Sequence, residues 1–306
     1  MMKILVTGGL GAIGSQLCKQ LKNQDNEIWI CDLYHSNKQK YLRCDISKYQ
    51  QIEKVITLIQ PDFVYHLAAE FGRINGEDHY FQLWQTNAIG TKNILRLQEK
   101  YNFKMCFTSS SEIYGDWKGL MSEDVPDQNP INQLNDYAIS KWVNEMQIIN
   151  STARFNTETV RVRLFNTYGP GEYYSPYRSV ICQFVYRALH NMPYTVYLDH
   201  HRTSSYVDDT VRTLANICKP QYFRPGEVYN IAGNEYHDIK TISDMILSYL
   251  GKDDKEITYQ TFEKHNTGDK KGDLTKAQNH LDHQPTVKLT DGIPLTIEWQ
   301  KTIYGI

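Results

Sequence analysis

The first 165 residues alternate short apolar runs with longer amphipathic stretches, and this alternation restricts the fold more than any other feature of the sequence. Five runs rich in β-branched and aromatic residues are expected to form strands, at 3–7, 27–32, 63–68, 104–109 and 158–164. The intervals between them carry the apolar spacing that is typical of helices. Apolar strands that alternate with helices indicate a parallel sheet covered on both faces. We therefore expect an α/β protein with a doubly wound parallel sheet.

A glycine-rich turn follows the first expected strand, in "LVTGGLGAIGSQL" (5–17). Gly9, Gly11 and Gly14 fit the spacing G-x-G-x-x-G, and Gly8, Gly11 and Gly14 fit the related G-x-x-G-x-x-G. Glycines at these positions allow a tight turn and let a pyrophosphate approach the backbone and the helix N-terminus. The turn therefore predicts a dinucleotide-binding, Rossmann-type domain.

Asp32 ends the second expected strand, about 20 residues after the turn. A carboxylate at this place accepts hydrogen bonds from the adenine ribose hydroxyls and disfavours a 2′-phosphate. The strand, the glycines and the acid together predict NAD, rather than NADP, as the cofactor.

A loop rich in Gly, Pro and Tyr, "NTYGPGEYYSPYRS" (166–179), marks a change in composition. We expect it to lead into a smaller C-terminal substrate-binding lobe. The predicted division is an NAD-binding domain over 1–168, with contributions from about 203–235, and a lobe made mainly of 169–306.

Candidate catalytic residues lie in "NDYAISK" (135–141), where Tyr137 and Lys141 are four positions apart at the start of an expected helix. This spacing places both side chains on one face. A neighbouring ammonium stabilises a phenolate, so the tyrosine can take a proton from a hydroxyl while hydride leaves the carbon. A hydroxyl-rich segment, "TSSSEIYG" (108–115), ends an upstream strand and would supply a further polar group.

The chain resembles the extended short-chain dehydrogenase/reductases that act on nucleotide sugars. The similarity covers nearly the whole length. It rests on these motifs: "TGGLGAIG", Asp32, "RCDI", "HLAA", "TNAIGTKNIL", "SSSEIYG", "YAISK", "RLFNTYGPG", "HHRTSSYVDD" and "GDLTKA … QPTVKLTDGI".

The resemblance implies a role for each matching residue. Ser110 would hydrogen-bond the sugar O4, Tyr137 would be the base, and Lys141 would be its partner and hold the nicotinamide ribose. Asn166 would contact the phosphate of the nucleotide sugar. Arg202 would pair with the diphosphate, for which the guanidinium fork is well suited. The residues expected at NAD are Gly8, Gly9, Gly11, Ala12, Ile13, Gly14, Asp32, Asp45, Ile46, Leu67, Ala68, Ala69, Asn87, Tyr137 and Lys141. No metal is expected.

Glu112 lies two positions after Ser110, and its role is open. In similar 4,6-dehydratases and UDP-glucuronate decarboxylases a glutamate at this position removes H5 once C4 is a ketone, because the ketone acidifies the neighbouring C–H. The alternative is a structural glutamate that caps a turn or holds a loop. We therefore expect Ser110, Glu112, Tyr137 and Lys141 as the catalytic set.

Three departures from the family pattern leave details open. Asp136 replaces the proline that commonly precedes the tyrosine. Lys270 or Lys271 replaces a second phosphate-binding arginine. The segment "EFGRINGEDHY" (70–80) is long and charged, and either contacts the substrate or is a solvated loop.

The resemblance predicts an enzyme that oxidises C4 of a nucleotide-diphosphate sugar, with a 4,6-dehydratase or a 4-epimerase ranked first. The alternatives are a 4-dehydrogenase that releases the ketone, for example from a GDP-heptose, and a UDP-glucuronate decarboxylase. An alternative of another class is a catalytically silent NAD-binding sensor or scaffold on the same fold.

Composition bears on partners and location. The 33 basic and 35 acidic residues give a net charge of −2, which offers no electrostatic case for nucleic acid or an anionic membrane. The six cysteines lack paired spacing and are expected to be reduced. We expect a soluble cytoplasmic protein and, from the family, a homodimer through a four-helix bundle. Trp84, Ile94, Trp142 and Ile149 would contact the partner there or belong to the core.

Overall fold

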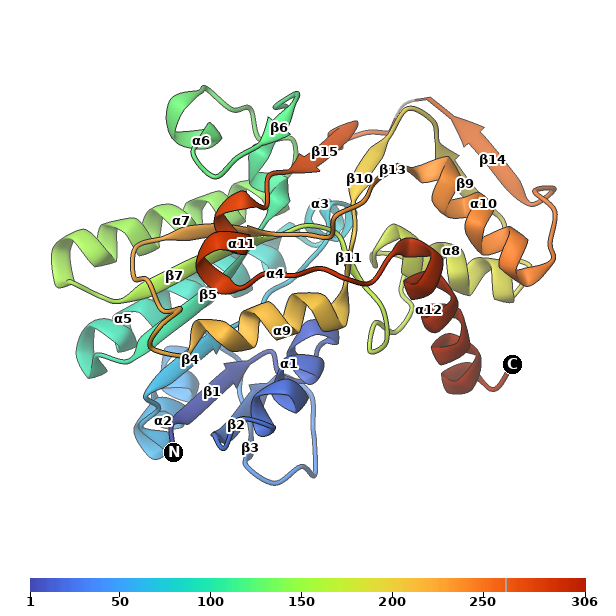
Figure 1. The fold of residues 1–306 in the computed structure, drawn as a ribbon. Coiled ribbons are helices and arrows are strands. Elements are labelled where there is room, and N and C mark those ends of the chain that lie inside the picture. Colours follow the sequence, from blue (N-terminus) through green and yellow to red (C-terminus); the bar gives the residue numbers. More distant parts are fainter. Residues whose placement is uncertain (262) are drawn as a thin grey trace.

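The computed structural model describes residues 1–261 and 263–306. A seven-stranded sheet in the order β12-β7-β5-β4-β1-β2-β3 forms the centre of the larger lobe (Figure 1). Every neighbouring pair in this sheet is parallel. Its strands are β1 (Lys3–Thr7), β2 (Glu27–Asp32), β3 (Tyr41–Arg43), β4 (Phe63–His66), β5 (Lys104–Ser110), β7 (Thr159–Leu164) and β12 (Val228–Ile231). The predicted doubly wound parallel sheet is confirmed.

Helices cover both faces of the sheet, and each face has its own apolar core. The strand alternation sends Ile4 and Val6 to one face and Leu5 to the other. The first face packs against α1 (Ala12–Lys22), α9 (Val207–Ile217) and α11 (Thr275–Leu281). The second packs against α2 (Tyr49–Ile59), α5 (Thr91–Tyr101) and α7 (Asp136–Phe155).

The segment after β4 is helical. It forms α3 (Arg73–Asp78), α4 (Tyr80–Trp84) and a π-helical turn (Gln85–Gly90) that runs directly into α5. Backbone contacts place α3 and the π-helical turn beside α7. The charged segment 70–80 is therefore packed on the helix that carries the predicted tyrosine and lysine.

The smaller lobe has a third apolar core. This lobe lies on the right of Figure 1. Its elements are α8 (Val180–Leu189), α10 (Ile239–Leu250), α12 (Leu289–Tyr304), β9 (Tyr194–Tyr197) and β14 (Ile257–Gln260).

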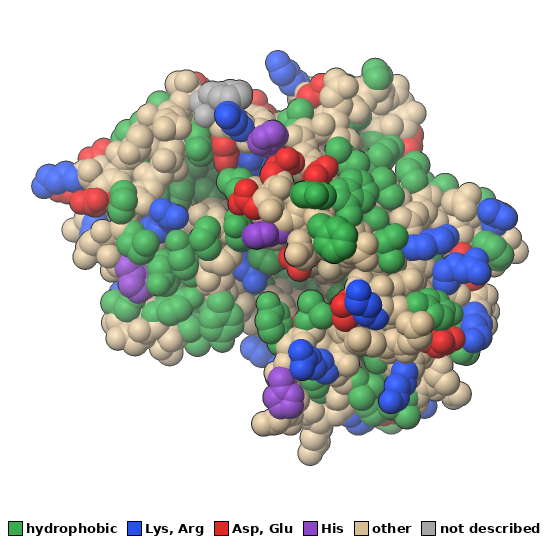
Figure 2. Space-filling view, turned by 180° about the vertical axis from the view of Figure 1, so that it is seen from behind, with side chains coloured by type: hydrophobic (Ala, Val, Ile, Leu, Met, Phe, Trp, Pro, Cys, Tyr) green, Lys and Arg blue, Asp and Glu red, His purple; other side chains and the backbone are tan. Residues whose placement is uncertain are grey.

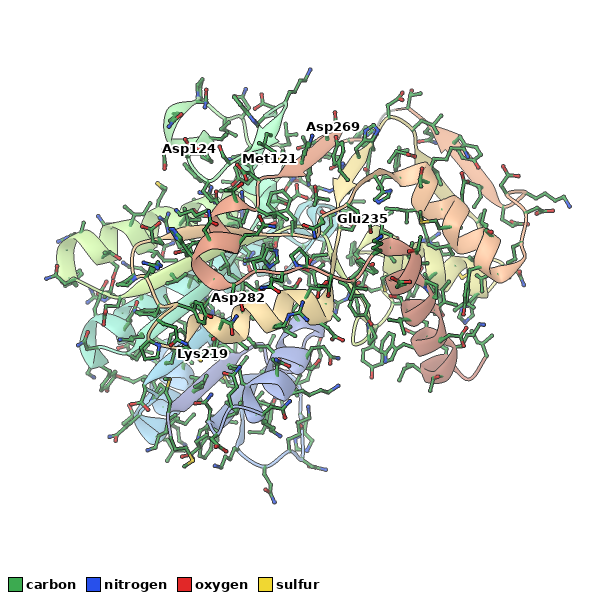
Figure 3. All side chains as sticks on the ribbon, in the orientation of Figure 1. Met121, Asp124, Lys219, Glu235, Asp269 and Asp282 are labelled. Atoms are coloured by element: carbon green, nitrogen blue, oxygen red, sulfur yellow. The ribbon has the colours of Figure 1, made fainter. Side chains whose placement is uncertain are left out.

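A small mixed sheet lies between the two lobes, in the order β13-β10-β15-β6 (Figure 1). Figure 3 labels Met121 on β6 and Asp269 at the start of β15, which run side by side. Its strands are β6 (Leu120–Met121), β10 (His201–Thr203), β13 (Tyr236–Asp238) and β15 (Asp269–Gly272). Because β10 and β15 pair in parallel with Arg202 opposite Lys270, this sheet brings two basic residues to one place.

Short elements complete the chain. A 3₁₀ turn (Ser111–Tyr114) follows β5, and α6 (Val125–Gln128) follows β6. The strands β8 (Thr167–Tyr168) and β11 (Ser205–Tyr206) pair in parallel. Within the described part of the chain, no helix is both long enough and apolar enough to span a bilayer.

Candidate active site

A cavity of about 970 Å³ lies between the two lobes, and the surface seen from behind is hollowed there (Figure 2). The carboxyl ends of β1, β4 and β5 open into it, at Gly8, Leu67 and Ser110. In doubly wound sheets, ligands bind at this edge, where the strand order reverses. The cavity therefore occupies the position where a dinucleotide is expected.

The glycine turn forms one wall of the cavity. Gly8 has a φ of +70°, which favours glycine, and its carbonyl accepts a hydrogen bond from the Gly11 amide at 3.1 Å. A side chain at Gly14 would collide with the Gly8 carbonyl and would lie 2.9 Å from the Gly9 Cα atom. No side chain caps the first turn of α1, so its amides remain available to an anion. This cradle fits the pyrophosphate of NAD.

Asp32 lines the same cavity at the end of β2. Its carboxylate accepts hydrogen bonds from the amide of Leu10 at 3.0 Å and from that of Leu33 at 2.8 Å. These bonds fix the side chain beside the glycine turn. The carboxylate therefore lies at the place where the sequence predicts a group for the ribose hydroxyls of an adenine nucleotide.

Two of the residues expected at NAD lie outside the cavity lining. Gly9 packs beneath the turn, where a side chain would lie 2.6 Å from a methyl group of Ile30. Asn87 is fully buried, and its amide bonds the backbone of Glu70, at 2.8 and 2.9 Å, and the Ser140 hydroxyl at 3.0 Å. Asn87 therefore fastens the 70–80 segment to α7. The residues that do line the cavity are Gly8, Gly11, Ala12, Ile13, Gly14, Asp32, Asp45, Ile46, Leu67, Ala68, Ala69, Tyr137 and Lys141.

Ser110, Tyr137 and Lys141 line the cavity together. Ser110 is the last residue of β5, and Tyr137 lies in the first turn of α7, which begins where Asn135 caps the Ala138 amide at 2.8 Å. The Lys141 ammonium donates to the Thr108 carbonyl at 2.9 Å and lies 5.9 Å from the centre of the Tyr137 ring. The expected hydroxyl, phenol and ammonium are therefore gathered at one point.

Burial governs the ionisation of this set. It raises the pKa of Tyr137 to about 12, although a hydrogen bond with Ser110 opposes the rise. It lowers the pKa of Lys141 to about 8, against the opposing effect of the Glu145 carboxylate. In the protein alone, Tyr137 is therefore a neutral phenol at neutral pH. Positive charge added nearby on cofactor binding would favour its phenolate.

Glu145 is a residue that the sequence reasoning missed. It is fully buried on α7 and accepts hydrogen bonds from Ser109 at 2.6 Å, from Arg163 at 2.9 Å and from Arg161 at 3.2 Å. The signal was present, because Glu145 follows Lys141 by four positions, as Lys141 follows Tyr137. An acid on the same helical face as two predicted catalytic residues marks a supporting residue.

Glu112 does not stand free in the cavity. Its carboxylate is paired with the ammonium of Lys270, and the Arg73 guanidinium lies 3.9 Å away. Burial alone would raise the pKa of Glu112, but Lys270, Arg73 and the more distant Arg202 together bring it below the ordinary value. Glu112 is therefore a carboxylate held among cations.

Arg73 belongs to the 70–80 segment, for which the sequence left open a substrate contact or a solvated loop. Its guanidinium pairs with Glu263 of the smaller lobe at 3.0 Å and faces Glu112. Glu70, Phe71, Gly72, Arg73 and Ile74 all line the cavity. This part of the segment is thus a wall of the site.

The two residues expected at the substrate phosphates also line the cavity. Arg202 is buried, and its Nη1 atom donates to the carbonyls of His201 and Gly268 at 2.7 and 2.6 Å. Asn166 adopts a positive φ of 23°, and its carbonyl accepts from the Ser205 amide at 3.2 Å. Lys271, unlike Lys270, is exposed and lies over the Tyr236 ring.

Comparison with known proteins gives a consistent result. The model of the NAD dependent epimerase/dehydratase family matches residues 4–232. UDP-N-acetyl-alpha-D-glucosaminuronate decarboxylase of Bacillus cytotoxicus is 30% identical, with 98% of each chain covered. UDP-glucuronic acid decarboxylase 6 of Arabidopsis thaliana is 30% identical, over 97% of this chain and 88% of its own.

Solved structures agree with these sequence relatives. UDP-glucuronic acid 4-epimerase from Bacillus cereus, in complex with UDP-glucuronic acid and NAD, superposes with a TM-score of 0.89 at 26% identity. The match covers 99% of this chain and 100% of that one. A dTDP-glucose 4,6-dehydratase from Bacillus anthracis, in complex with NAD, gives a TM-score of 0.84 at 25% identity.

Proposed function

The chain belongs to the NAD-dependent epimerase/dehydratase family, and we propose that it uses Ser110, Tyr137 and Lys141 to oxidise C4 of a nucleotide-diphosphate sugar. NAD is the cofactor of this enzyme family, and the cavity residues fit it. The observation that carries the proposal is that these three side chains line the same cavity as the glycine turn and Asp32. The enzymatic relatives set aside the silent scaffold as an alternative.

Each side chain has a task that follows from its position. The Ser110 hydroxyl orients the sugar O4, and the Tyr137 oxygen takes the O4 proton. Lys141, held by the Thr108 carbonyl, stabilises the phenolate that accepts this proton. NAD, when bound, supplies the hydride acceptor for C4.

The second half of the reaction is the finer question. A 4,6-dehydratase or an epimerase remains our first expectation from the family resemblance, and Glu112 favours chemistry beyond epimerisation. Uronate decarboxylation is a second candidate, because three basic side chains, Arg73, Arg202 and Lys270, surround Glu112 in the structure. The relatives that are 30% identical over nearly the whole chain are decarboxylases of UDP-linked uronates.

A substrate panel tests the proposal. The purified enzyme is incubated with NAD and, separately, with UDP-glucuronate, UDP-glucose, GDP-mannose and dTDP-glucose, and both NADH absorbance and product mass are followed. Loss of CO₂ would identify a decarboxylase, loss of water a dehydratase, and an unchanged mass with a new stereoisomer an epimerase. Loss of two hydrogens with lasting NADH would identify a 4-dehydrogenase. If no sugar yields either NADH or a product, the proposal is wrong.

We also propose that the protein forms a homodimer through α4, the π-helical turn and α7. These elements carry exposed apolar side chains, namely Tyr80, Phe81, Ile89, Met146 and Ile149. Among the residues expected from the sequence, Ile149 fits this role, whereas Ile94 is fully buried in the core. The proposal requires these side chains to form one apolar patch, as contact surfaces do.

A further inference from the structure

We propose that Lys270, rather than Glu112, exchanges a proton with C5 of the 4-keto sugar, and that Glu112 positions Lys270 for this exchange. This inference rests on the proposed oxidation at C4, which creates the ketone. It concerns the step that follows that oxidation.

The surroundings of Glu112 make it a poor proton acceptor. Its Oε1 atom faces both Lys270 and Arg73, and both cations stabilise the carboxylate form. The net effect lowers the pKa of Glu112, so a proton on this group would be held more weakly than on an ordinary glutamate. A base weakened in this way removes a proton from carbon slowly.

Lys270 is placed to do the work instead. Its side chain is only 2% exposed, yet it lines the cavity that Ser110 and Tyr137 also line. It projects from β15, next to Asp269, which Figure 3 labels between the two lobes. Its partner Glu112 lies two residues after Ser110, so the ammonium is held close to the end of the cavity where C4 would react.

The charges around Lys270 tune it for proton exchange. Burial, together with Arg202 on β10 and Arg73 on α3, lowers the pKa of Lys270 to about 8, while Glu112 opposes this shift. At neutral pH the side chain is then a neutral amine in about a tenth of the molecules, and this amine is a usable base. The ammonium form of the same group is a usable acid.

The proton step balances in both directions. The neutral amine takes the C5 proton and becomes an ammonium, the C–H electrons form the C4–C5 double bond, and the ketone oxygen becomes an enolate. Return of the proton to the same face regenerates the 4-keto sugar, and in D₂O this reversal places deuterium at C5. In a dehydration the enolate instead re-forms the ketone, a C5–C6 double bond forms, and the C6 hydroxyl takes the proton of the Lys270 ammonium and leaves as water. In a decarboxylation the enolate arises when the C5–C6 bond breaks and CO₂ leaves, and the ammonium then protonates C5.

Deuterium exchange separates this role from a purely electrostatic one. The enzyme and NAD are incubated in D₂O with UDP-glucuronate and with each other sugar of the panel that produces NADH, and deuterium at C5 is measured by NMR. The variant Lys270→Arg keeps the positive charge beside Glu112, but a guanidinium does not release its proton. We expect exchange at C5 to fall by about 100-fold or more while single-turnover NADH formation remains.

Two further variants complete the design. Glu112→Gln removes the carboxylate but leaves the amine, and we expect C5 exchange to fall by less than about tenfold. Lys271→Arg is the matched control, because Lys271 is adjacent and exposed, and it should leave both rates unchanged. Spontaneous exchange of the 4-keto sugar without enzyme is subtracted.

Several outcomes would overturn the inference. It is wrong if Lys270→Arg retains C5 exchange, if Glu112→Gln abolishes it, or if the wild type forms NADH without exchanging C5. If Lys270→Arg fails to fold, the pH dependence of the wild-type enzyme tests the proposal in its place. Where Lys270 removes the C5 proton, the ratio of C5 exchange to NADH formation should rise with pH through about 8, and where it protonates C5 after loss of CO₂ the ratio should fall through the same pH. A ratio that does not change with pH would contradict the proposal. Absence of NADH with every sugar would instead refute the proposed function, and the inference with it.

Discussion

Tyr137 and Lys141 are pushed in opposite directions by the same burial. The phenol is harder to ionise than usual and the ammonium is easier to neutralise. Each shift works against a phenolate beside an ammonium, so neighbouring charges must offset the effect of burial. The Glu145 carboxylate offsets part of it, because it raises the pKa of Lys141. At the scale of the residue, the site at neutral pH is a neutral phenol beside a mostly protonated lysine, and it becomes active when further positive charge favours the phenolate.

The first prediction concerns this pair. Tyr137→Phe should lower the rate of C4 oxidation by about 10²–10⁴-fold, because the group that takes the O4 proton is lost. In the wild type, the rate should rise with pH and level off above about pH 8, because Lys141 then loses its charge as fast as the phenol ionises. Lys141→Met should remove this break near pH 8, so that the rate keeps rising toward the higher pKa of the phenol. Single-turnover NADH formation across pH measures both, and an unchanged profile in Lys141→Met would contradict this reading.

The second prediction concerns Asp32. Asp32→Ser removes the carboxylate that is fixed by the amides of Leu10 and Leu33. We expect the Kd for NAD to rise about 10–100-fold and the preference for NAD over NADP to shrink, since charged hydrogen bonds contribute about 1.5–3 kcal/mol. Calorimetric titration of both nucleotides measures this. Asp25→Asn, an exposed acid before β2 and therefore at its opposite end, should leave both values unchanged.

At the scale of the element, α7 ties the catalytic residues to the sheet. Tyr137, Lys141 and Glu145 occupy one face of this helix, and Glu145 is bonded to Ser109 on β5 and to Arg163 on β7. These bonds fix the rotation of the helix about its axis relative to the strands. The network therefore both stabilises the fold and orients the catalytic side chains.

The third prediction follows from that network. Glu145→Gln leaves the charge of Arg163, which is 1% exposed, without its buried partner, and should lower the free energy of unfolding by about 3–5 kcal/mol. Replacing both residues by Met should cost less, because no charge is then buried alone. Urea unfolding at neutral pH measures both variants.

The stability that is lost in Glu145→Gln should depend on pH in a definite direction. The pKa of Glu145 is lowered in the folded protein from its ordinary value of 4.5, because Arg163 and Arg161 outweigh burial. Its contribution is therefore complete above about 4.5 and disappears as the pH falls through the lower folded value. The difference between the wild type and Glu145→Gln should shrink in acid, and a difference that grows would contradict the assignment.

At the scale of the whole molecule, the site exists only because the two lobes meet. Arg73 from the larger lobe reaches Glu263 of the smaller one, and the mixed sheet carries Arg202 and Lys270 to the end of β5. The cavity is consequently bounded by residues from most of the chain. Substrate chemistry is set at this junction rather than in either lobe alone.

The fourth prediction concerns assembly. If α4, the π-helical turn and α7 form the dimer contact, the wild type should have twice the mass of one chain by light scattering at micromolar concentration. Phe81→Glu combined with Ile149→Glu should give monomers, because charges would be buried at the interface. Leu295→Glu, on an exposed position of α12, is the control. A monomeric wild type would refute the proposed dimer.

The strands were predictable to different degrees. The first two, at 3–7 and 27–32, have the bounds that the sequence predicted, because each is an apolar run ended by a turn or an acid. The edge strands β3 and β12 were not predicted as strands. Their short segments carry too little pattern, and pairing with β2 and β7 makes them strands.

The sequence by itself determined the family, the glycine turn, Asp32 and the pair Tyr137–Lys141. Each of these depends on spacing within one turn or one helix, and local geometry fixes such spacing whatever surrounds it. Glu145 has the same spacing from Lys141 and could have been identified from the sequence as well.

Only the tertiary structure decided the state of Glu112. Its partner Lys270 is 158 positions away in the sequence, and Arg73 and Glu263 come from different lobes. No local pattern predicts that these charges meet, because their distances depend on how the lobes pack. Their meeting decides whether Glu112 is a base or a positioning group, since the ionisation of a buried carboxylate follows from the charges that packing places beside it.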